Sequence, residues 1–464
     1  MFQLPRLPPI MKYLLLLTFI GLFTTSYCQS YIAKNKALED IDYVNNTIQE
    51  THVNPFLFIS KQKYLVEVQS LKKSIKDSIE IKDFLRLLYK MTALLKDGHT
   101  APHLAQPAFR SELQQEIFLP FSLVIENTSL YVPKTTAEVS GIPKGASITS
   151  INNKNVKELL IDMSKYTGGT KEHSKEMQNK LFSYFLFLSH VSAPFTIIYK
   201  DSSGKQHQQL VEKGVKFIDA LSVTMPHLKS PYSFRVIDNK LGYFDFRNMS
   251  VDMNELDKYL DSCVGLLKDN QIRYLAVDLR KNAGGNSANG DLLLSYLTKD
   301  KYLLSGGKDW KISDLYKEQL RKNGDTTNEY LSRQTGTIWH TNTCITHAPL
   351  FVNKDIYNGK VFFLTNPFTF SSANMLADGA KQFKLATLVG EETGENCSDF
   401  GEAFNFLLPN SRIRMQASSS FEYGADCDKN KFVPVTPNRL MKSTVWDKIN
   451  EKDIPVQFIL NQID

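Results

Sequence analysis

The sequence lacks the features that mark several specialised classes of protein. No long segment is low in complexity, and with 42% hydrophobic and 22% charged residues the composition is that of an ordinary globular protein. No block is rich in lysine and arginine, and a formal net charge of +6 is small for 464 residues, so nucleic acid is not an implied partner. A chain of this length is too long for one compact core, and we expect two or three domains.

Cysteine is scarce as well, since the chain has five. None of them has the spacing of zinc ligands, and the sequence predicts neither a metal site nor a cofactor. Cys397 and Cys427 lie in polar loops at the two ends of an expected hairpin, which makes them the candidate disulfide pair. Cys263 falls on the apolar face of an expected helix and is predicted to be a buried thiol.

The beginning of the chain has the pattern of an export signal. Lys12 precedes an apolar run from Tyr13 to Phe23, and small polar residues follow before Cys28. This run is too short to cross a bilayer comfortably, and no later stretch is long and apolar enough to span a membrane. We therefore predict a cleaved signal peptide over residues 1–28 and a periplasmic or extracellular protein, in which disulfides are allowed. The alternative is that Cys28 accepts a lipid, which the bulky Tyr27 before it disfavours.

The stretch from Val361 to Gly390 organises the rest of the chain. It is expected to form a buried strand up to Thr365, a short turn that holds Ser371 and Ser372, a helix, and a second apolar strand. A strand–turn–helix corner can lift a serine hydroxyl out of the fold, beside backbone N–H groups that stabilise an oxyanion. The plainer interpretation is that one of the two serines caps the helix, because serine is a favoured N-cap residue.

The N-terminal part of the chain has a helical pattern. Its best segment, Ile81 to Lys96, ends abruptly at Asp97-Gly98-His99-Thr100, where Gly98 suits a left-handed C-cap. His99 is therefore expected on a tight loop at a helix end. A histidine there is usually an ordinary surface or capping residue, but the neighbouring aspartate and threonine allow a functional role.

The middle of the chain changes to short strand-like pieces, of which Phe118 to Val124 is the first. The segment from Gly141 to Val156 combines a proline–glycine turn, a strand and an Asn-Asn turn, and it resembles the core of a PDZ domain. A helical insertion from Ser174 to Leu188 and a closing strand from Phe195 to Tyr199 follow. PDZ domains bind an extended peptide at a sheet edge; the alternative is a small β-domain without a ligand.

The last part, from about Tyr232, alternates strands and helices, which implies a mainly parallel sheet with crossover helices. Leu241 to Phe246 is expected to be one strand and Tyr274 to Leu279 another, which leads into the motif DLRKNAGG at residues 278–285. In such sheets chemistry gathers at the carboxyl ends of the strands. Both this motif and the turn at Ser371 lie at such ends.

The order of these motifs resembles one enzyme family. A strand ending in DLRxNxGG, followed about ninety residues later by a strand, a T-x-S turn, a helix and LVGEET, is similar to the carboxyl-terminal-processing (tail-specific) serine peptidases. Their relatives include the tricorn core peptidase and the interphotoreceptor retinoid-binding repeats. The resemblance implies an α/β catalytic domain at residues 216–464 with a ClpP/crotonase-like, mainly parallel sheet. It also implies an N-terminal helical domain at 29–112 and a PDZ-like β-rich domain at 113–215.

Carried over residue by residue, the resemblance places Ser371 at the nucleophile. The N–H of Ser372 and one from the Gly284-Gly285 turn would form the oxyanion hole, because two fixed backbone donors can stabilise the developing charge by several kcal/mol. A glycine pair also lets the backbone approach the substrate closely.

The resemblance also implies which residue acts as the base. The tail-specific branch uses a lysine, but Asn396 stands at that position and cannot accept the serine proton at neutral pH. The tricorn-like branch uses a histidine from an N-terminal helical element, which makes His99 the general base. For the residue that orients it, Asp426 and Asp428 are the nearest acids in the late part of the catalytic domain, with Asp97 as a local alternative.

The sequence therefore predicts an exported serine peptidase that hydrolyses peptide or protein substrates through an acyl-enzyme on Ser371, with His99 as base. The alternative is a non-catalytic protein that holds a peptide or a small apolar ligand in the same cleft. That alternative is favoured by Asn396, which replaces the lysine, and by Asn374, which replaces a glutamate usual in the family. A third hypothesis is an esterase or another acyl hydrolase.

Overall fold

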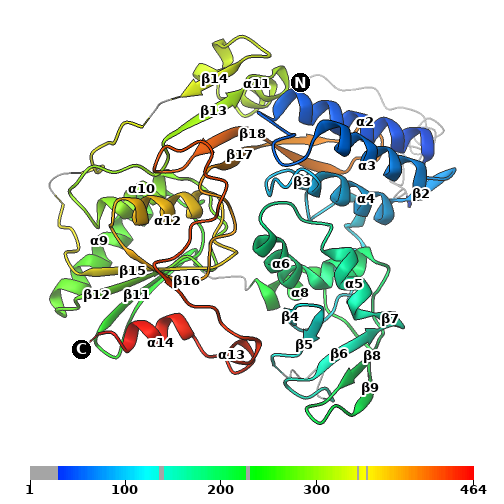
Figure 1. Cartoon of the computed structure of the whole chain (residues 1–464), viewed down its shortest axis with the longest axis horizontal. Helices are drawn as coiled ribbons and strands as arrows, with labels where there is room; N and C mark the ends of the chain where they lie inside the picture. Colours follow the sequence, from blue (N-terminus) through cyan, green and yellow to red (C-terminus); the bar gives the residue numbers. More distant parts are fainter. Residues whose placement is uncertain (1–29, 135–140, 226–229, 342–343, 352–353, 464) are drawn as a thin grey trace, which may run out of the picture.

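The structure is a computed structural model, and it describes residues 30–134, 141–225, 230–341, 344–351 and 354–463 (Figure 1). The predicted signal peptide at residues 1–28 lies outside the described residues. Among the helices of the described ranges, none has the length and apolar character that a membrane crossing requires.

Three helices form the N-terminal part, as the helical pattern predicts. They are α2 (Lys34–Thr51), α3 (Lys61–Ser74) and α4 (Ile81–Ala93), with a small antiparallel pair, β1 (Tyr31–Ala33) and β2 (Ser78–Glu80), beside them. The apolar face of α4 is fully buried at Phe84, Leu88 and Met91. This burial holds the end of α4, and the loop that carries His99, against the rest of the molecule.

The middle of the chain forms an antiparallel sheet, which we call the β4–β9 sheet. Its strands, in spatial order, are β4 (Val124–Glu126), β5 (Ser129–Tyr131), β6 (Ser147–Ile151), β8 (Phe195–Lys200) and β9 (Gln206–Val211), with β7 (Lys154–Asn155) paired to β6. Four helices accompany it: α5 (Val156–Met163), α6 (Lys171–Lys180), α7 (Phe182–Leu188) and α8 (Phe217–Thr224).

The prediction of one strand in this region is wrong. The stretch from Phe118 to Val124 contributes an isolated bridge between Phe118 and Val215, and a regular strand begins at Val124. Pro120 in its middle has no N–H for a ladder hydrogen bond. The helical insertion is present as α6 and α7, and β4 forms an edge of the sheet. Peptide docking at such an edge stays a prediction.

A mainly parallel sheet forms the centre of the C-terminal part, as predicted. Its order is β10 (Tyr232–Ile237), β11 (Leu241–Phe246), β12 (Tyr274–Asp278), β15 (Lys360–Thr365), β16 (Thr387–Gly390) and β19 (Arg439–Leu440), and all neighbours are parallel except β10 and β11. One face packs on α9 (Met253–Asp269), α10 (Ala288–Ser295) and α12 (Ser372–Gln382). The other face packs on α14 (Ile454–Leu460), which follows the short α13 (Val445–Ile449).

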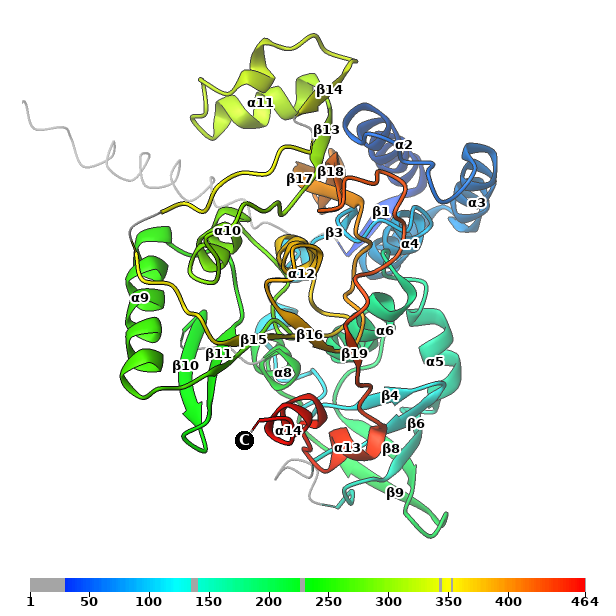
Figure 2. The same ribbon diagram turned by 60° about the vertical axis from the view of Figure 1, so that its left-hand side comes forward.

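A second sheet joins the two ends of the chain. It consists of β14 (Ile338–Thr341), β13 (Gly307–Lys311), β18 (Arg414–Tyr423) and β17 (Asp399–Leu407), and β3 (Ala101–Pro102) pairs with β18. The strand β3 follows His99 directly, so this pairing brings the N-terminal loop to the C-terminal part. Figure 2 shows β3 beside β18, with α11 (Asp314–Lys322) projecting from the far end of the sheet.

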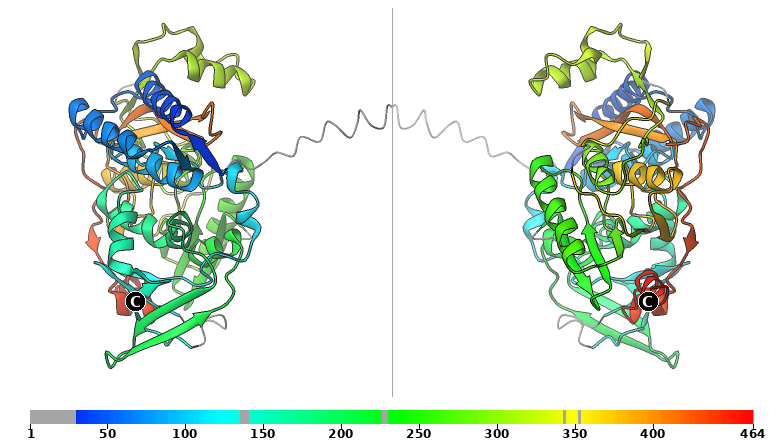
Figure 3. Two further views of the ribbon diagram at one scale, coloured as in Figure 1. Left: turned by 90° about the vertical axis from the view of Figure 1, so that its right-hand side faces the viewer. Right: turned by 90° about the vertical axis from the view of Figure 1, so that its left-hand side faces the viewer.

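The views agree on how these parts lie. Figure 3 shows the N-terminal helices above the β4–β9 sheet on one side of the molecule, and the parallel sheet with α9 and α12 on the other. The carboxyl ends of the parallel strands face the junction between these parts. Short 3₁₀ turns complete the described elements (Pro107–Phe109, Glu112–Gln114 and Glu329–Ser332).

The predicted disulfide between Cys397 and Cys427 is wrong, because Cys427 is bonded to Cys344 instead, across 83 residues. Gly306 lies between the two partners: Cys344 N donates to its carbonyl, and a β-carbon built on Gly306 would lie 2.8 Å from the Cys427 Cα. Cys397 is a buried free thiol. Cys263 is also buried and free on α9, which confirms that prediction.

Candidate active site

Ser371 occupies a strained corner between β15 and α12. Its backbone has φ +53° and ψ −130°, a conformation that a non-glycine residue rarely adopts and that often marks a functional site. The residue holds the N-cap position of α12, but its side chain makes no capping hydrogen bond. The hydroxyl of Ser372 donates instead to Gly285 O at 2.7 Å. Neither serine side chain caps the helix, and the plainer interpretation is therefore wrong.

The glycine turn packs directly against this corner. A β-carbon on Gly284 would lie 2.7 Å from Ser371 Cβ and 2.9 Å from Ser372 N, which only glycine avoids. Gly284 has φ +100° and donates its N–H to Asn282 Oδ1 at 2.8 Å. Gly284 therefore allows its turn to pack closely against Ser371 and Ser372. Its N–H is already hydrogen-bonded to Asn282 and is not free to bind an oxyanion.

Two backbone donors remain at the corner. The N–H groups of Gly285 and Ser372 make no hydrogen bond to any residue of the described ranges. The Ser372 N–H belongs to the first turn of α12, where N–H groups have no intrahelical partner. Both residues line the same cavity as Ser371. Of the two predicted glycines, Gly285 is thus the one with an available donor, and a carbonyl oxygen beside Ser371 would find two N–H groups.

The loop after α4 is held by Asp97, which is fully buried. Its Oδ1 accepts the His99 N–H at 2.8 Å, and its Oδ2 accepts the hydroxyls of Thr100 and Ser418 at 2.5 and 2.7 Å. Burial acts to raise the pKa of Asp97, but His52, 3.2 Å from Oδ2, outweighs it and holds the pKa well below its usual range. Asp97 therefore fixes the loop as an anion.

The left-handed residue of this loop is not the one predicted. Lys96 has φ +56°, whereas Gly98 has no positive φ. Gly98 is required for another reason, since a β-carbon there would lie 2.6 Å from the ring of Phe370. The N-terminal loop and the residue before Ser371 thus touch each other.

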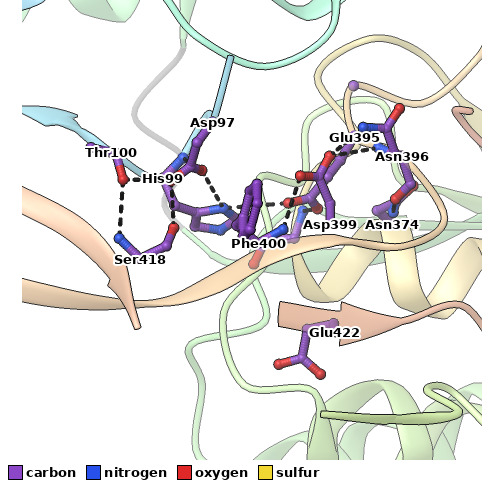
Figure 4. A network of polar contacts seen from close by, with 12 residues as sticks. Asp97, His99, Thr100, Asn374, Glu395, Asn396, Asp399, Phe400, Ser418 and Glu422 are labelled. Atoms are coloured by element: carbon purple, nitrogen blue, oxygen red, sulfur yellow. Dashed lines mark hydrogen bonds and ion pairs between the residues drawn. The ribbon is translucent and has the colours of Figure 1, made fainter. Parts of the chain in front are cut away.

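His99 lies between two carboxyl groups (Figure 4). Its Nδ1 is 3.3 Å from Glu395 Oε1 and 4.0 Å from Asp97 Oδ1. Its ring packs on Phe370 with centroids 4.7 Å apart. Burial lowers the pKa of His99, against the opposing charges of Asp97 and Glu402. The imidazole is therefore neutral at pH 7 and able to accept a proton.

Glu395 joins the two halves of the site. Its Oε2 accepts the Ser371 N–H at 2.7 Å, and its Oε1 faces His99 Nδ1. Burial and the nearby Asp399 raise the pKa of Glu395. Sequence reasoning missed this residue, although it stands next to Asn396 in the loop GEETGENCSD. The sequence does place an acid next to the lysine position of the tail-specific branch. The direction in which the Glu395 side chain points could not be inferred from the sequence.

Asp428 is not brought to the site. It lies in an exposed turn, where its carboxylate accepts the Asn430 N–H at 2.9 Å. Asp426 is held by Lys431 at 2.6 Å. Among the described residues, the carboxylates within 4.0 Å of the His99 ring nitrogens are those of Asp97 and Glu395. The orienting role predicted for Asp428 therefore has no support in the geometry, because its turn folds back on itself.

Ser371 and His99 line one cavity of about 570 Å³. Ser372, Gly285 and Glu395 line it too. A nucleophile, a neutral imidazole, a carboxyl and two backbone donors thus share one space, which is the set that acyl transfer requires.

Comparison with known proteins identifies the family. Residues 240–404, which include β11, Ser371 and Glu395, match peptidase family S41. This stretch of the chain is therefore an S41 peptidase domain. It is a serine-type peptidase, so peptides or proteins are its substrates. No curated protein matches the sequence.

Solved structures of CPAF share the fold of this S41 peptidase over most of its length. Mature CPAF complexed with lactacystin is 14% identical with a TM-score of 0.65, covering 92% of this chain and 97% of that chain. Mature CPAF is also 14% identical, with a TM-score of 0.61 and coverage of 91% and 99%. The photosystem II D1 C-terminal processing protease is 14% identical with a TM-score of 0.43, covering 88% and 93%.

Among the described residues that line this cavity, no lysine is free of ion pairs. Asn396, at the lysine position of the tail-specific branch, donates its Nδ2 to Asp399 Oδ2 at 2.8 Å. Lys308 is the lysine among the described residues that line the cavity, and it is held by Glu402 and Glu422 at 2.8 and 2.6 Å.

Proposed function

We propose that this chain is an exported peptidase that cleaves peptide bonds through an acyl-enzyme on Ser371, with His99 as general base. One observation carries the proposal: a single carboxyl, that of Glu395, contacts both the Ser371 N–H and His99 Nδ1. Two residues that lie 272 positions apart in the sequence are thereby fixed to one group.

Each residue then has a defined task in the reaction. Nδ1 of His99 faces Glu395 Oε1, which leaves Nε2 to take the proton of the Ser371 hydroxyl as it attacks the substrate carbonyl. The positive charge that His99 gains would lie 4.0 Å from the Asp97 carboxylate, which is held ionised and favours it. The N–H groups of Gly285 and Ser372 would bind the oxyanion. His99 returns the proton to the leaving amine, and water hydrolyses the acyl-enzyme by the same steps.

The second candidate is a protein that binds a ligand in this cavity without catalysis. Asn396 and Asn374 favour it, because both differ from the residues usual in the family. The retention of Ser371, His99 and a carboxyl between them favours the enzyme, since binding alone requires none of the three.

Labelling with a fluorophosphonate probe tests the proposal, because the probe bonds an activated serine covalently. We expect rapid labelling of the folded mature chain, none in Ser371→Ala, and labelling slowed roughly 10²- to 10⁴-fold in His99→Ala. Ser203→Ala, in the exposed turn between β8 and β9, is the matched control and should label like the wild type. Absence of labelling in the folded wild type would leave the ligand-binding candidate.

Export is part of the same proposal and has its own test. Mass spectrometry of the chain released by an export-competent host should give a mature N-terminus near Cys28, and a variant without residues 1–28 should stay inside the cell. A lipid mass on Cys28 would instead show that the protein is anchored to a membrane.

A further inference from the structure

The cavity beside Ser371 contains a buried hydrogen-bond acceptor without a partner. Asn374 lies in the first turn of α12, lines the cavity and is 2% exposed. Its Nδ2 donates to Asn396 O at 2.8 Å, while its Oδ1 makes no hydrogen bond with the described residues. A buried amide oxygen without a donor is costly. A ligand that offers an N–H group in this cavity would satisfy it.

The walls of the same cavity carry more carboxyl groups than lysine side chains. Among the described lining residues are four carboxyl groups, of Glu395, Asp399, Glu402 and Glu422, and one lysine, Lys308. The ammonium of Lys308 is shared between Glu402 Oε1 and Glu422 Oε1. Two carboxyl groups thus share one ammonium, and their remaining oxygens can accept from a second cation.

The four carboxyl groups are not equally available. Glu395 is engaged with Ser371 and His99, and Asp399 accepts the backbone N–H groups of Asn396 and Phe400. The acceptors left for a ligand are therefore Asn374 Oδ1 and the pair Glu402 and Glu422. Figure 4 shows Glu422 apart from the group formed by Glu395 and Asp399. Burial raises the pKa of Glu422 although Lys308 lies beside it, so a further cation would favour its ionised form.

We propose that this cavity selects a lysine or arginine side chain in the peptide residue whose carbonyl Ser371 attacks. That residue stays bonded to Ser371 in the acyl-enzyme, so its side chain is held beside the cavity walls. An ammonium has three N–H donors and a guanidinium five, enough to serve Asn374 Oδ1 and a carboxylate of the same cavity together. The inference rests on the proposed function, because it assumes that Ser371 forms the acyl-enzyme.

Peptidyl diphenyl phosphonates with different side chains test this selection. Ser371 Oγ would bond to phosphorus, one phenolate would leave, and the serine proton would pass through His99 to it to give phenol. The probes carry a lysine-like, an arginine-like, a norleucine-like or a glutamate-like side chain on an otherwise identical peptide. On the mature wild-type chain we expect the lysine-like and arginine-like probes to react at least tenfold faster than the norleucine-like one, and the glutamate-like probe to be slowest.

Variants connect the preference to the named residues. In Asn374→Leu and in Glu422→Gln the ratio of the lysine-like to the norleucine-like rate should fall several-fold, whereas Asn374→Asp should raise it. If the two substitutions of Asn374 change this rate ratio in opposite directions, the changes cannot result from unfolding. Glu318→Gln, at an exposed residue of α11 that pairs with Lys322, is the matched control and should keep the wild-type ratio.

Failure of the proposed side-chain selection can be distinguished from failure of the proposed peptidase activity. If the fluorophosphonate labels Ser371 but the norleucine-like or glutamate-like phosphonate reacts as fast as the cationic ones, the selection for a basic side chain is overturned while the peptidase proposal stands. If the fluorophosphonate labels nothing in the folded chain, both proposals fall.

Discussion

At the scale of single residues, Glu395 is the group on which the two halves of the site depend. Its two oxygens contact Ser371 N and His99 Nδ1, at 2.7 and 3.3 Å. The serine comes from the C-terminal part of the chain and the histidine from the N-terminal part. We propose that this carboxyl orients the imidazole, which is the task of the third residue in serine hydrolases.

Replacement of this residue gives the first prediction. Glu395→Gln keeps the size of the side chain but replaces the carboxyl that faces Nδ1 of His99 with an amide, so hydrolysis should slow roughly 10²- to 10⁴-fold. Glu392→Gln, in the same loop, should leave the rate unchanged, because Glu392 contacts Thr436 and not the site. Steady-state kinetics with a fluorogenic peptide measures both. An active Glu395→Gln variant would show that another group orients the histidine.

Gly284 carries the second prediction. In Gly284→Ala the new methyl group would meet Ser371 Cβ at 2.7 Å and Ser372 N at 2.9 Å, and the residue would also be strained at φ +100°. We expect fluorophosphonate labelling to fall at least tenfold, because the corner must shift, and the free energy of unfolding to drop by about 1–3 kcal/mol.

Gly204→Ala is the control for this variant. It has a similar positive φ of +83° but no atom within 4 Å of the added carbon, so it isolates the conformational cost from the clash. Fluorophosphonate labelling of Gly204→Ala should equal that of the wild type. Equal labelling in the two variants would contradict the packing of Gly284 on Ser371.

At the scale of elements, α6 supports the catalytic turn from the side of the β4–β9 sheet. His173 on α6 stacks on Phe370 at 4.4 Å, and its Nδ1 lies 3.0 Å from Pro367 O. The N-cap hydroxyl of this helix, from Thr170, donates to Gly394 O in the loop of Glu395. The helix therefore holds both the turn before Ser371 and the loop that carries the carboxyl.

His173 makes this support sensitive to pH, which is the third prediction. Burial lowers its pKa to about 4, although the Pro367 carbonyl opposes the shift, and the unfolded value is near 6.5. Between these values the unfolded chain binds the proton and the folded chain does not. The stability from neutral His173 is thus complete above pH 6.5 and is lost as the pH falls towards 4.

Urea unfolding at pH 7 and pH 4.5 measures this loss. From pH 7 to pH 4.5 the wild type should lose about 2–3 kcal/mol more than His173→Gln, whose side chain does not titrate. Other groups titrate equally in the two chains, so the difference isolates His173. An identical pH dependence in both would contradict the buried neutral histidine.

At the scale of the whole molecule, the site exists because the two ends of the chain meet. The strand β3 pairs with β18, and Gln416 of β18 donates to His99 O at 2.9 Å. Asp40 of α2 adds a second link, since it accepts the N–H groups of Asn410 and Ser411 at 3.0 and 2.8 Å. Both links join the N-terminal helices to the hairpin of β17 and β18.

The fourth prediction tests this junction. Asp40 is fully buried, and Asp40→Ala would leave the N–H groups of Asn410 and Ser411 without their acceptor. The free energy of unfolding should fall by about 2–4 kcal/mol. Asp42→Ala, at a largely exposed residue of the same helix that pairs with Lys72, should cost less than about 1 kcal/mol. Urea unfolding of both variants gives the comparison, and equal losses would contradict the junction.

The elements and the residues at their ends can be predicted from the amino-acid sequence alone. Apolar runs bounded by turn residues predict β11, β12, β15 and β16, because a strand buried on both faces is apolar along its length. The alternation of strands and helices predicts the parallel sheet. Ser371 and the glycine turn then follow as residues at the carboxyl ends of its strands.

Which side chains meet depends on how distant parts of the chain pack against each other. The contact of Glu395 with His99, the choice of Gly285 over Gly284 as donor, and the pairing of Cys344 with Cys427 all join segments that are distant in the sequence. Periodicity and turn chemistry report the local backbone and the face that is buried, but not the direction of a polar side chain in a loop. That direction is set by packing between parts of the chain, as when β3 pairs with β18 and delivers His99 to the cavity.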